Sequence, residues 1–181
     1  MKLDDDDFTL FGLPPHFALD GEELATRWRA LQAQVHPDRH AAAGAAAQRV
    51  AMQWATRVNE GYRRLQDPLR RAAYLCELRG VAIDAERNTA MPRDFLLEQM
   101  AWREALDAAG DDRSAVEAID ADVGRDEAAR LAAVGSLLDG AGAGAAAVDV
   151  PAAAAQVRAL MFVRRFRADL AQRLDALESA C

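Results

Sequence analysis

The fold of this chain is decided by residues 24–39, which read LATRWRALQAQVHPDR. Apolar residues stand at positions 24, 28, 31 and 35, and spacings of 4, 3 and 4 put them on one face of a helix. Asp20, followed by a glutamate three residues later, is a capping-box pattern that opens this helix. Pro37 ends it, because the proline ring disfavours helical geometry in the preceding residue. The sequence therefore predicts one amphipathic helix between Asp20 and Pro37.

A second amphipathic helix follows, beginning within the alanine-rich residues 41–47. Its apolar face carries Val50, Trp54, Val58, Tyr62 and Leu65. Two such helices with a short connection bury their apolar stripes by packing antiparallel, so the sequence predicts a helical hairpin. A short apolar cluster over residues 8–13 precedes the hairpin, and a helix from Asp67-Pro68 to Gly80 follows it. Residues 8–80 are thus predicted to form one compact helical unit.

The remaining chain predicts a second helical unit. Residues 81–90 (VAIDAERNTA) lack helical periodicity and are expected to form a linker. Helices are expected from Pro92 to about Gly110, from a cap at Ser114 to about Leu138, and from about Pro151 onward. The last of them places apolar residues at near-heptad spacing: Leu160, Val163, Phe166, Leu170, Leu174 and Leu177. Three helices of this length predict an antiparallel bundle.

Composition favours an all-α fold and excludes several classes of protein. Alanine and leucine, which favour helices, greatly outnumber isoleucine and threonine among the 181 residues. The net charge of −7 argues against a general nucleic-acid binder, which neutralises phosphates with basic side chains. Cys76 and Cys181 lie far apart, with no CxxC or His/Cys cluster beside them. The sequence therefore predicts neither a structural zinc site nor a disulfide framework.

Membrane contact and secretion are not expected either. No apolar run approaches the ~18 residues that a membrane span requires. The aspartate run Asp4–Asp7 is the opposite of the basic start of a signal peptide, and we interpret it as an acidic tail ahead of the folded chain. The sequence thus predicts a cytoplasmic protein.

The connection between the two helices of the hairpin reads His36-Pro37-Asp38-Arg39. A helical hairpin needs only a polar turn at this place, so stability does not require His, Pro and Asp in this order. An ordinary Pro-Asp turn with Asp38 as a helix cap is the simpler interpretation of the isolated tripeptide. His36 and His40 have a spacing that can bind a metal on a helix, but Pro37 interrupts any helix between them. No third ligand stands nearby, so we expect no metal site.

In its context, this tip resembles that of the J-domain family, which stimulates ATP hydrolysis by a partner heat-shock chaperone. The resemblance rests on a basic first helix, the His-Pro-Asp tip and a long second helix before Asp-Pro. It implies that the tip engages the ATPase and linker region of the chaperone, with Asp38 pairing an arginine there. Basic residues near the tip would complement an acidic chaperone surface. The implied chaperone-binding residues are His36, Pro37, Asp38, Arg39, Arg27 and Arg29.

A narrower resemblance covers nearly the whole chain. The stretches FTLFGLPPHFALD, LQAQVHPDR, NEGYRRLQDPLRRAAYLCELRG and DFLLEQMAWREALD are similar to HscB co-chaperones of iron–sulfur cluster assembly. This family implies a J-domain at 1–80, a linker at 81–90 and a C-terminal bundle at 91–181 that holds a scaffold protein. The implied partners are an HscA-type ATPase and an IscU-type scaffold, with no catalytic residue and no cofactor in this chain. A J-domain adapter for a different client is the alternative.

The first helix of the bundle has two apolar faces. At ~100° per residue, Phe95, Trp102 and Leu106 fall on one side, whereas Leu96, Leu97 and Met100 fall on the other. A three-helix bundle can bury only one of these faces fully, so the second is either a docking patch or is covered by the linker or the first unit. The family resemblance favours scaffold binding by Leu96, Leu97, Met100, Glu104 and Phe162.

An enzyme with an active site inside the bundle is a third possibility. Glu98 with Glu104 could be imagined as a carboxylate pair for acid–base chemistry. These residues lie on helix faces with no pocket implied, so solvated charge is the simpler interpretation. Such an enzyme would carry a bound metal, which the sequence does not predict.

Overall fold

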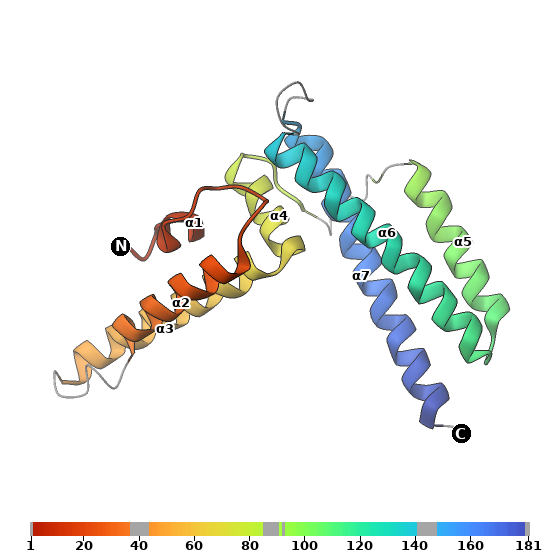
Figure 1. Ribbon diagram of the computed structural model, residues 1–181, viewed down its shortest axis with the longest axis horizontal. Helices are drawn as coiled ribbons and strands as arrows, with labels where there is room; N and C mark the ends of the chain where they lie inside the picture. Colours follow the sequence, from red (N-terminus) through yellow and green to blue (C-terminus); the bar gives the residue numbers. More distant parts are fainter. Residues whose placement is uncertain (1, 37–43, 85–90, 92, 141–147, 180–181) are drawn as a thin grey trace. The chain divides into compact units, whose positions relative to one another are not determined.

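The computed structural model describes residues 2–36, 44–84, 91, 93–140 and 148–179 (Figure 1). In these ranges the chain forms seven α-helices and no strand, which confirms the predicted all-α fold. The chain divides into two compact units, Met1–Leu75 and Cys76–Cys181. None of the described helices combines the length and apolar character that crossing a membrane requires.

The predicted hairpin is the frame of the N-terminal unit. Helices α2 (Gly21–Val35) and α3 (Ala45–Gln66) run side by side, as Figure 1 shows. The carboxylate of Asp20 caps α2 by accepting hydrogen bonds from the amides of residues 22 and 23, as the capping pattern predicts. Trp28 of α2 stacks on Tyr62 of α3 with ring centroids 4.7 Å apart. Its indole N–H donates to Asn59 at 3.1 Å, so the polar edge of this core aromatic is satisfied.

A short helix, α1 (Asp7–Phe11), packs on the hairpin through a buried charge. The side chain of Asp7 is fully buried, and its carboxylate lies 2.6 Å from Arg57 and 3.1 Å from Arg64. The amide of Asp7 also donates to the Tyr74 hydroxyl at 3.0 Å. The interpretation of Asp4–Asp7 as an acidic tail is therefore wrong for its last two residues, because Asp6 is the N-cap of α1 and Asp7 is buried. Asp7 begins the fold, because two guanidinium groups offset the cost of burying its charge.

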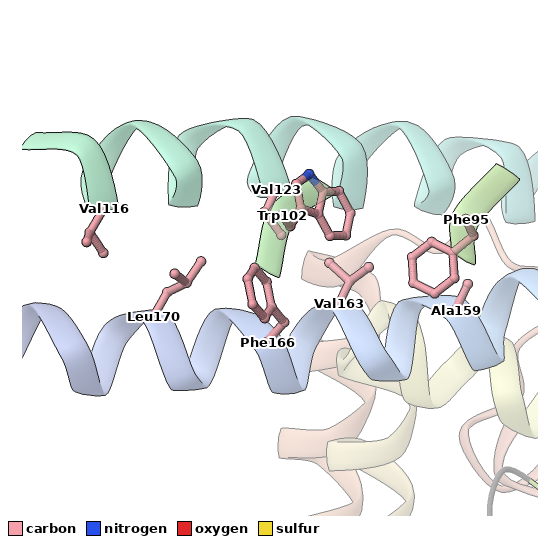
Figure 2. Close-up of a cluster of buried hydrophobic side chains, with 8 residues drawn as sticks. All are labelled: Phe95, Trp102, Val116, Val123, Ala159, Val163, Phe166 and Leu170. Carbon is pink, nitrogen blue, oxygen red and sulfur yellow. The ribbon is translucent and has the colours of Figure 1, made fainter. Parts of the chain in front are cut away.

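The C-terminal unit is a bundle of α5 (Arg93–Ala109), α6 (Arg113–Asp139) and α7 (Val150–Ser179). Helices α6 and α7 pack along most of their lengths, and α5 lies against α6. Figure 2 shows the side chains that fill the space between the three helices. They are Phe95, Trp102, Val116, Val123, Ala159, Val163, Phe166 and Leu170. The predicted three-helix bundle is confirmed.

The predicted cap at Ser114 is wrong by two residues. Asp112 is the N-cap of α6, and its carboxylate accepts hydrogen bonds from the amides of Ser114 and Ala115. The hydroxyl of Ser114 donates to the same carboxylate at 2.7 Å. An aspartate two residues upstream thus takes the role, with Ser114 as its hydrogen-bond donor.

The boundary between the units falls within α4 (Pro68–Leu78), before the end of the expected J-domain at residue 80. Cys76 on this helix is buried, and burial raises the pKa of its thiol to about 11. The thiol therefore stays protonated at neutral pH. Of the expected linker at 81–90, residues 85–90 lie outside the described residues, whereas Ile83 is buried and its carbonyl accepts a hydrogen bond from Arg158 at 3.5 Å.

Candidate functional site

The candidate chaperone contact lies where α2 ends. His36 is the C-cap of this helix, with extended backbone angles of φ −61° and ψ 127°, and it is exposed. Extended backbone is what the residue before a proline favours, so the helix stops where the sequence predicts. Pro37, Asp38, Arg39 and His40 lie outside the described residues.

The two arginines assigned to this site have different surroundings. Arg27 is partly buried and donates hydrogen bonds to the carbonyls of Phe11 and Gly12, each at 2.9 Å, and to the Glu23 carboxylate at 2.6 Å. Arg29 is exposed and donates to Thr26 Oγ1 at 3.2 Å. Two residues apart on a helix, these arginines point about 200° from each other. Arg27 thus holds the end of α1, whereas Arg29 presents its charge to solvent.

The candidate scaffold contact lies on α5, whose two faces differ sharply in exposure. Phe95 is 0% exposed and Trp102 is 8% exposed. On the opposite side, Leu96 is 45%, Leu97 62% and Met100 60% exposed. These values match the two-faced helix that the sequence predicts. Clustered exposed apolar side chains of this size are typical of a protein contact surface.

Phe162 of α7 borders this surface but is also part of the core edge. It is half-buried, with its ring edge-on to Phe95 at 5.8 Å and stacked on Phe166 at 6.4 Å. The guanidinium of Arg103 lies 5.4 Å from the centroid of the Phe162 ring. Arg103 and Leu96 are seven residues apart, so they project within about 20° of each other on α5. Phe162 therefore lies on the Leu96 side of this helix.

A groove of about 450 Å³ separates α5 from α7 at this place, lined by Leu106, Phe162, Phe166 and the charged residues Arg103, Arg165 and Asp169. The exposed Glu104 projects from the side of α5 opposite the core, close in direction to Leu97. The surface therefore runs from Phe162 across Leu96 and Met100 to Leu97 and Glu104. We call these five residues the α5 strip.

The sequence does not identify Arg130, the residue that holds α5 against α6. Arg130 of α6 donates to Asp126 at 2.6 Å, to Gln156 of α7 at 3.1 Å, and to Glu98 of α5. Its guanidinium also lies 4.5 Å from the centroid of the Phe95 ring. Glu98 is therefore not the simply solvated charge that the sequence suggests. No periodic pattern could reveal this, because the contacts depend on how three helices pack.

In the part of the chain that the structure describes, no three His, Cys, Asp or Glu side chains gather into a group that could hold a metal ion.

Comparison with known proteins gives consistent results. Residues 91–171 match the family model of the HscB C-terminal oligomerisation domain. Two co-chaperone protein HscB homologs, from Burkholderia multivorans and Burkholderia thailandensis, are 49% and 52% identical to this chain. The alignment covers 99% of this chain and 99% of the first relative, and 98% and 99% for the second.

Two solved structures are also similar. The chaperone HscB from Vibrio cholerae has a TM-score of 0.78 and 35% identity, covering 96% of this chain and 99% of its own. The human co-chaperone protein HscB has a TM-score of 0.84, covering 95% of this chain and 83% of its own. At 24% identity, the human protein supports the fold alone.

Proposed function

This chain belongs to the HscB family of co-chaperones, and from that premise we propose that it stimulates an HscA-type ATPase and delivers an IscU-type iron–sulfur scaffold to it. The observation that carries the proposal is the α5 strip, in which Leu97 and Met100 are 62% and 60% exposed beside the fully buried Phe95. A helix that leaves such residues in water has a surface suited to an apolar partner.

The chaperone contact in this proposal is the tip of the hairpin, formed by His36, Pro37, Asp38 and Arg39 with Arg29 and Arg27 behind it. Supporting it, α2 is capped at its start and stops at His36, so a firmly held helix carries the tip. The tip acts by binding one conformational state of the chaperone better than the other, which shifts the chaperone towards hydrolysis. A contact this small suits a transient encounter.

The chaperone half of the proposal is tested by the steady-state ATPase rate of an HscA-type chaperone. Wild-type protein accelerates this rate, and Asp38→Asn abolishes the acceleration because the carboxylate can no longer pair with an arginine. Asp122→Asn on the exposed surface of α6 is the matched control and accelerates the rate as the wild type does. Equal acceleration by Asp38→Asn would reject the mechanism.

The cargo half is tested by titrating the full chain with the apo form of an IscU-type scaffold. Truncating an apolar side chain at the centre of an interface costs about 1–2 kcal/mol, so Leu96→Ala with Met100→Ala weakens binding at least tenfold. Val148→Ala removes a comparably exposed apolar side chain, 51% exposed, from outside the strip and leaves the affinity unchanged. Unchanged affinity of the double variant would remove the strip from the account.

A J-domain adapter for a different client is the second candidate. It shares the tip and the exposed strip, so neither feature separates the two. The titration does: a scaffold that does not bind the wild-type chain favours the other client. In the proposed role the protein works in the cytoplasm, and the cluster is cargo carried by the scaffold.

A further inference from the structure

We infer that Arg130 is the positioning residue of the scaffold site: it fixes the rotation of α5 about its own axis, and so determines that Leu96, Leu97 and Met100 of the α5 strip face outward. This inference rests on the proposed function for its consequence in binding. Its structural part, the rotation of α5, does not depend on that function.

Helix α5 needs such a device because both of its faces are apolar. A turn of about 100° would carry Leu96 to the place that Phe95 occupies, and burying Leu96 and Met100 would remove apolar surface from water. The hydrophobic effect is non-directional and does not by itself decide which face lies inside. Shape complementarity and polar contacts have to decide.

Arg130 supplies contacts that only one rotation satisfies. Its guanidinium lies over the face of the Phe95 ring, 4.5 Å from the ring centroid, and forms an ion pair with Glu98. These two residues stand immediately before and after Leu96 and Leu97 in the sequence. Because Phe95 and Glu98 are both held against α6, the side chains of Leu96 and Leu97 point away from the bundle.

The rest of the network keeps the guanidinium itself in place. Asp126, one turn earlier on α6, and Gln156 of α7 accept its other hydrogen bonds at 2.6 and 3.1 Å. The Arg130 side chain is only 13% exposed. Rotation of α5 would remove Glu98 and the Phe95 ring from a cation with little access to water, and this penalty opposes the alternative register.

A second arginine provides a matched control. Arg167 of α7 also bridges helices, with Asp120 and Glu127 of α6 both at 2.9 Å. Among the described residues, both of these ion pairs join α7 to α6 and neither involves α5. Arg167→Met therefore removes an interhelical ion network of the same unit without releasing the scaffold site.

The experiment compares full-length wild type, Arg130→Met, Arg130→Lys and Arg167→Met. Apo-scaffold affinity is measured by titration, and the rotation of α5 is followed by the fluorine resonance of 5-fluorotryptophan at Trp102, which is buried among Phe95 and Phe166. Arg130→Met is expected to weaken binding about tenfold and to shift or split the Trp102 resonance. Arg130→Lys restores part of both, and Arg167→Met changes neither.

The inference is overturned if Arg130→Met keeps the wild-type affinity and resonance, or if Arg167→Met weakens binding equally, since the effect would then be general bundle stability. Should Arg130→Met fail to fold, Glu98→Gln removes the same ion pair at a residue 44% exposed and takes its place in both measurements. If the wild type does not bind the scaffold, the proposed function fails. The Trp102 resonance still decides whether Arg130 fixes α5.

Discussion

A largely buried charged residue helps to tie each of helices α1 and α5 to its unit: Asp7 for α1 and Arg130 for α5. The two helices differ in what they do with their apolar side chains. Around α1, Phe8, Phe11 and Leu13 are all at most 7% exposed. Helix α5 buries Phe95 but leaves Leu97 62% exposed.

A buried ion pair that holds a helix therefore does not by itself show that the apolar side chains of that helix are part of a core. At α1 the anchor closes a core that apolar packing already favours. At α5 it holds a helix whose outward face would gain from being buried. The same chemistry thus completes a core in one unit and holds a helix with an exposed apolar face in the other.

The largest expected effect is a direct test of this contrast between Phe8 and Leu97. Phe8→Ala empties a buried site and is expected to lower the free energy of unfolding of the N-terminal unit by about 4 kcal/mol. Leu97→Ala is expected to change that of the C-terminal unit by less than about 0.5 kcal/mol, because the side chain is exposed. Urea unfolding measures both. A large loss for Leu97→Ala would mean that the outward face of α5 is part of a core.

Removing the anchor of α1 is expected to have the next largest effect. Asp7→Ala leaves Arg57, whose side chain is 20% exposed, without its buried partner and lowers the free energy of unfolding of the N-terminal unit by about 3 kcal/mol. Asp5→Ala, which removes a partly exposed carboxylate from the same run, is the control and has little effect. A loss below about 1 kcal/mol for Asp7→Ala would show that this buried charge does not hold α1.

Replacing a helical glycine with alanine is expected to lower stability in the N-terminal unit and to raise it in the C-terminal unit. A Cβ at Gly61 of α3 would lie 3.2 Å from Arg57, Asp7 and Phe11, so Gly61→Ala crowds the anchor and is expected to cost about 1 kcal/mol or more. A Cβ at Gly124 of α6 would meet the Arg167 guanidinium no closer than 3.5 Å. Gly124→Ala is therefore expected to gain about 0.5–1 kcal/mol from helix propensity. Thermal unfolding of each variant checks the signs, and a stabilising Gly61→Ala would contradict the tight packing of α1.

The smallest expected effect concerns the aspartates that cap α1 and α6. Partial burial alone would raise the pKa of Asp6, but hydrogen bonds from the hydroxyl and amide of Thr9 outweigh it and lower the pKa. The Ser114 hydroxyl and the Ala115 amide lower the pKa of Asp112 in the same way. Both caps therefore stabilise above the ordinary aspartate pKa, and this stabilisation is lost as pH falls through the lowered value.

Asp112→Asn tests this pH dependence at the α6 cap. Asparagine caps helices as well as aspartate but does not titrate, so the variant should lose less stability than the wild type between about pH 4 and pH 2. Urea unfolding across that range measures the difference. Identical pH profiles would show that the charge on Asp112 does not contribute.

The sequence predicts much of this architecture because apolar residues spaced at the helical period lie on one face of each helix in the folded chain. The stripe from Leu24 to Val35 and the two faces of α5 follow from helical geometry alone, and the structure has both. Asp7 could not be predicted, since nothing local separates it from the three aspartates before it. Arg130 could not be predicted either, because its role depends on the packing of α5, α6 and α7.

The central claim is that two separate surfaces act together, the tip on the chaperone and the α5 strip on the scaffold. The most direct measurement is the ATPase rate of an HscA-type chaperone against co-chaperone concentration, with and without apo-scaffold. Without scaffold, Leu97→Ser with Met100→Ser should stimulate the ATPase as the wild type does. Apo-scaffold should lower the co-chaperone concentration needed for half-maximal stimulation by the wild type, but not by this variant. If scaffold lowers it equally for this variant and the wild type, the claim is contradicted.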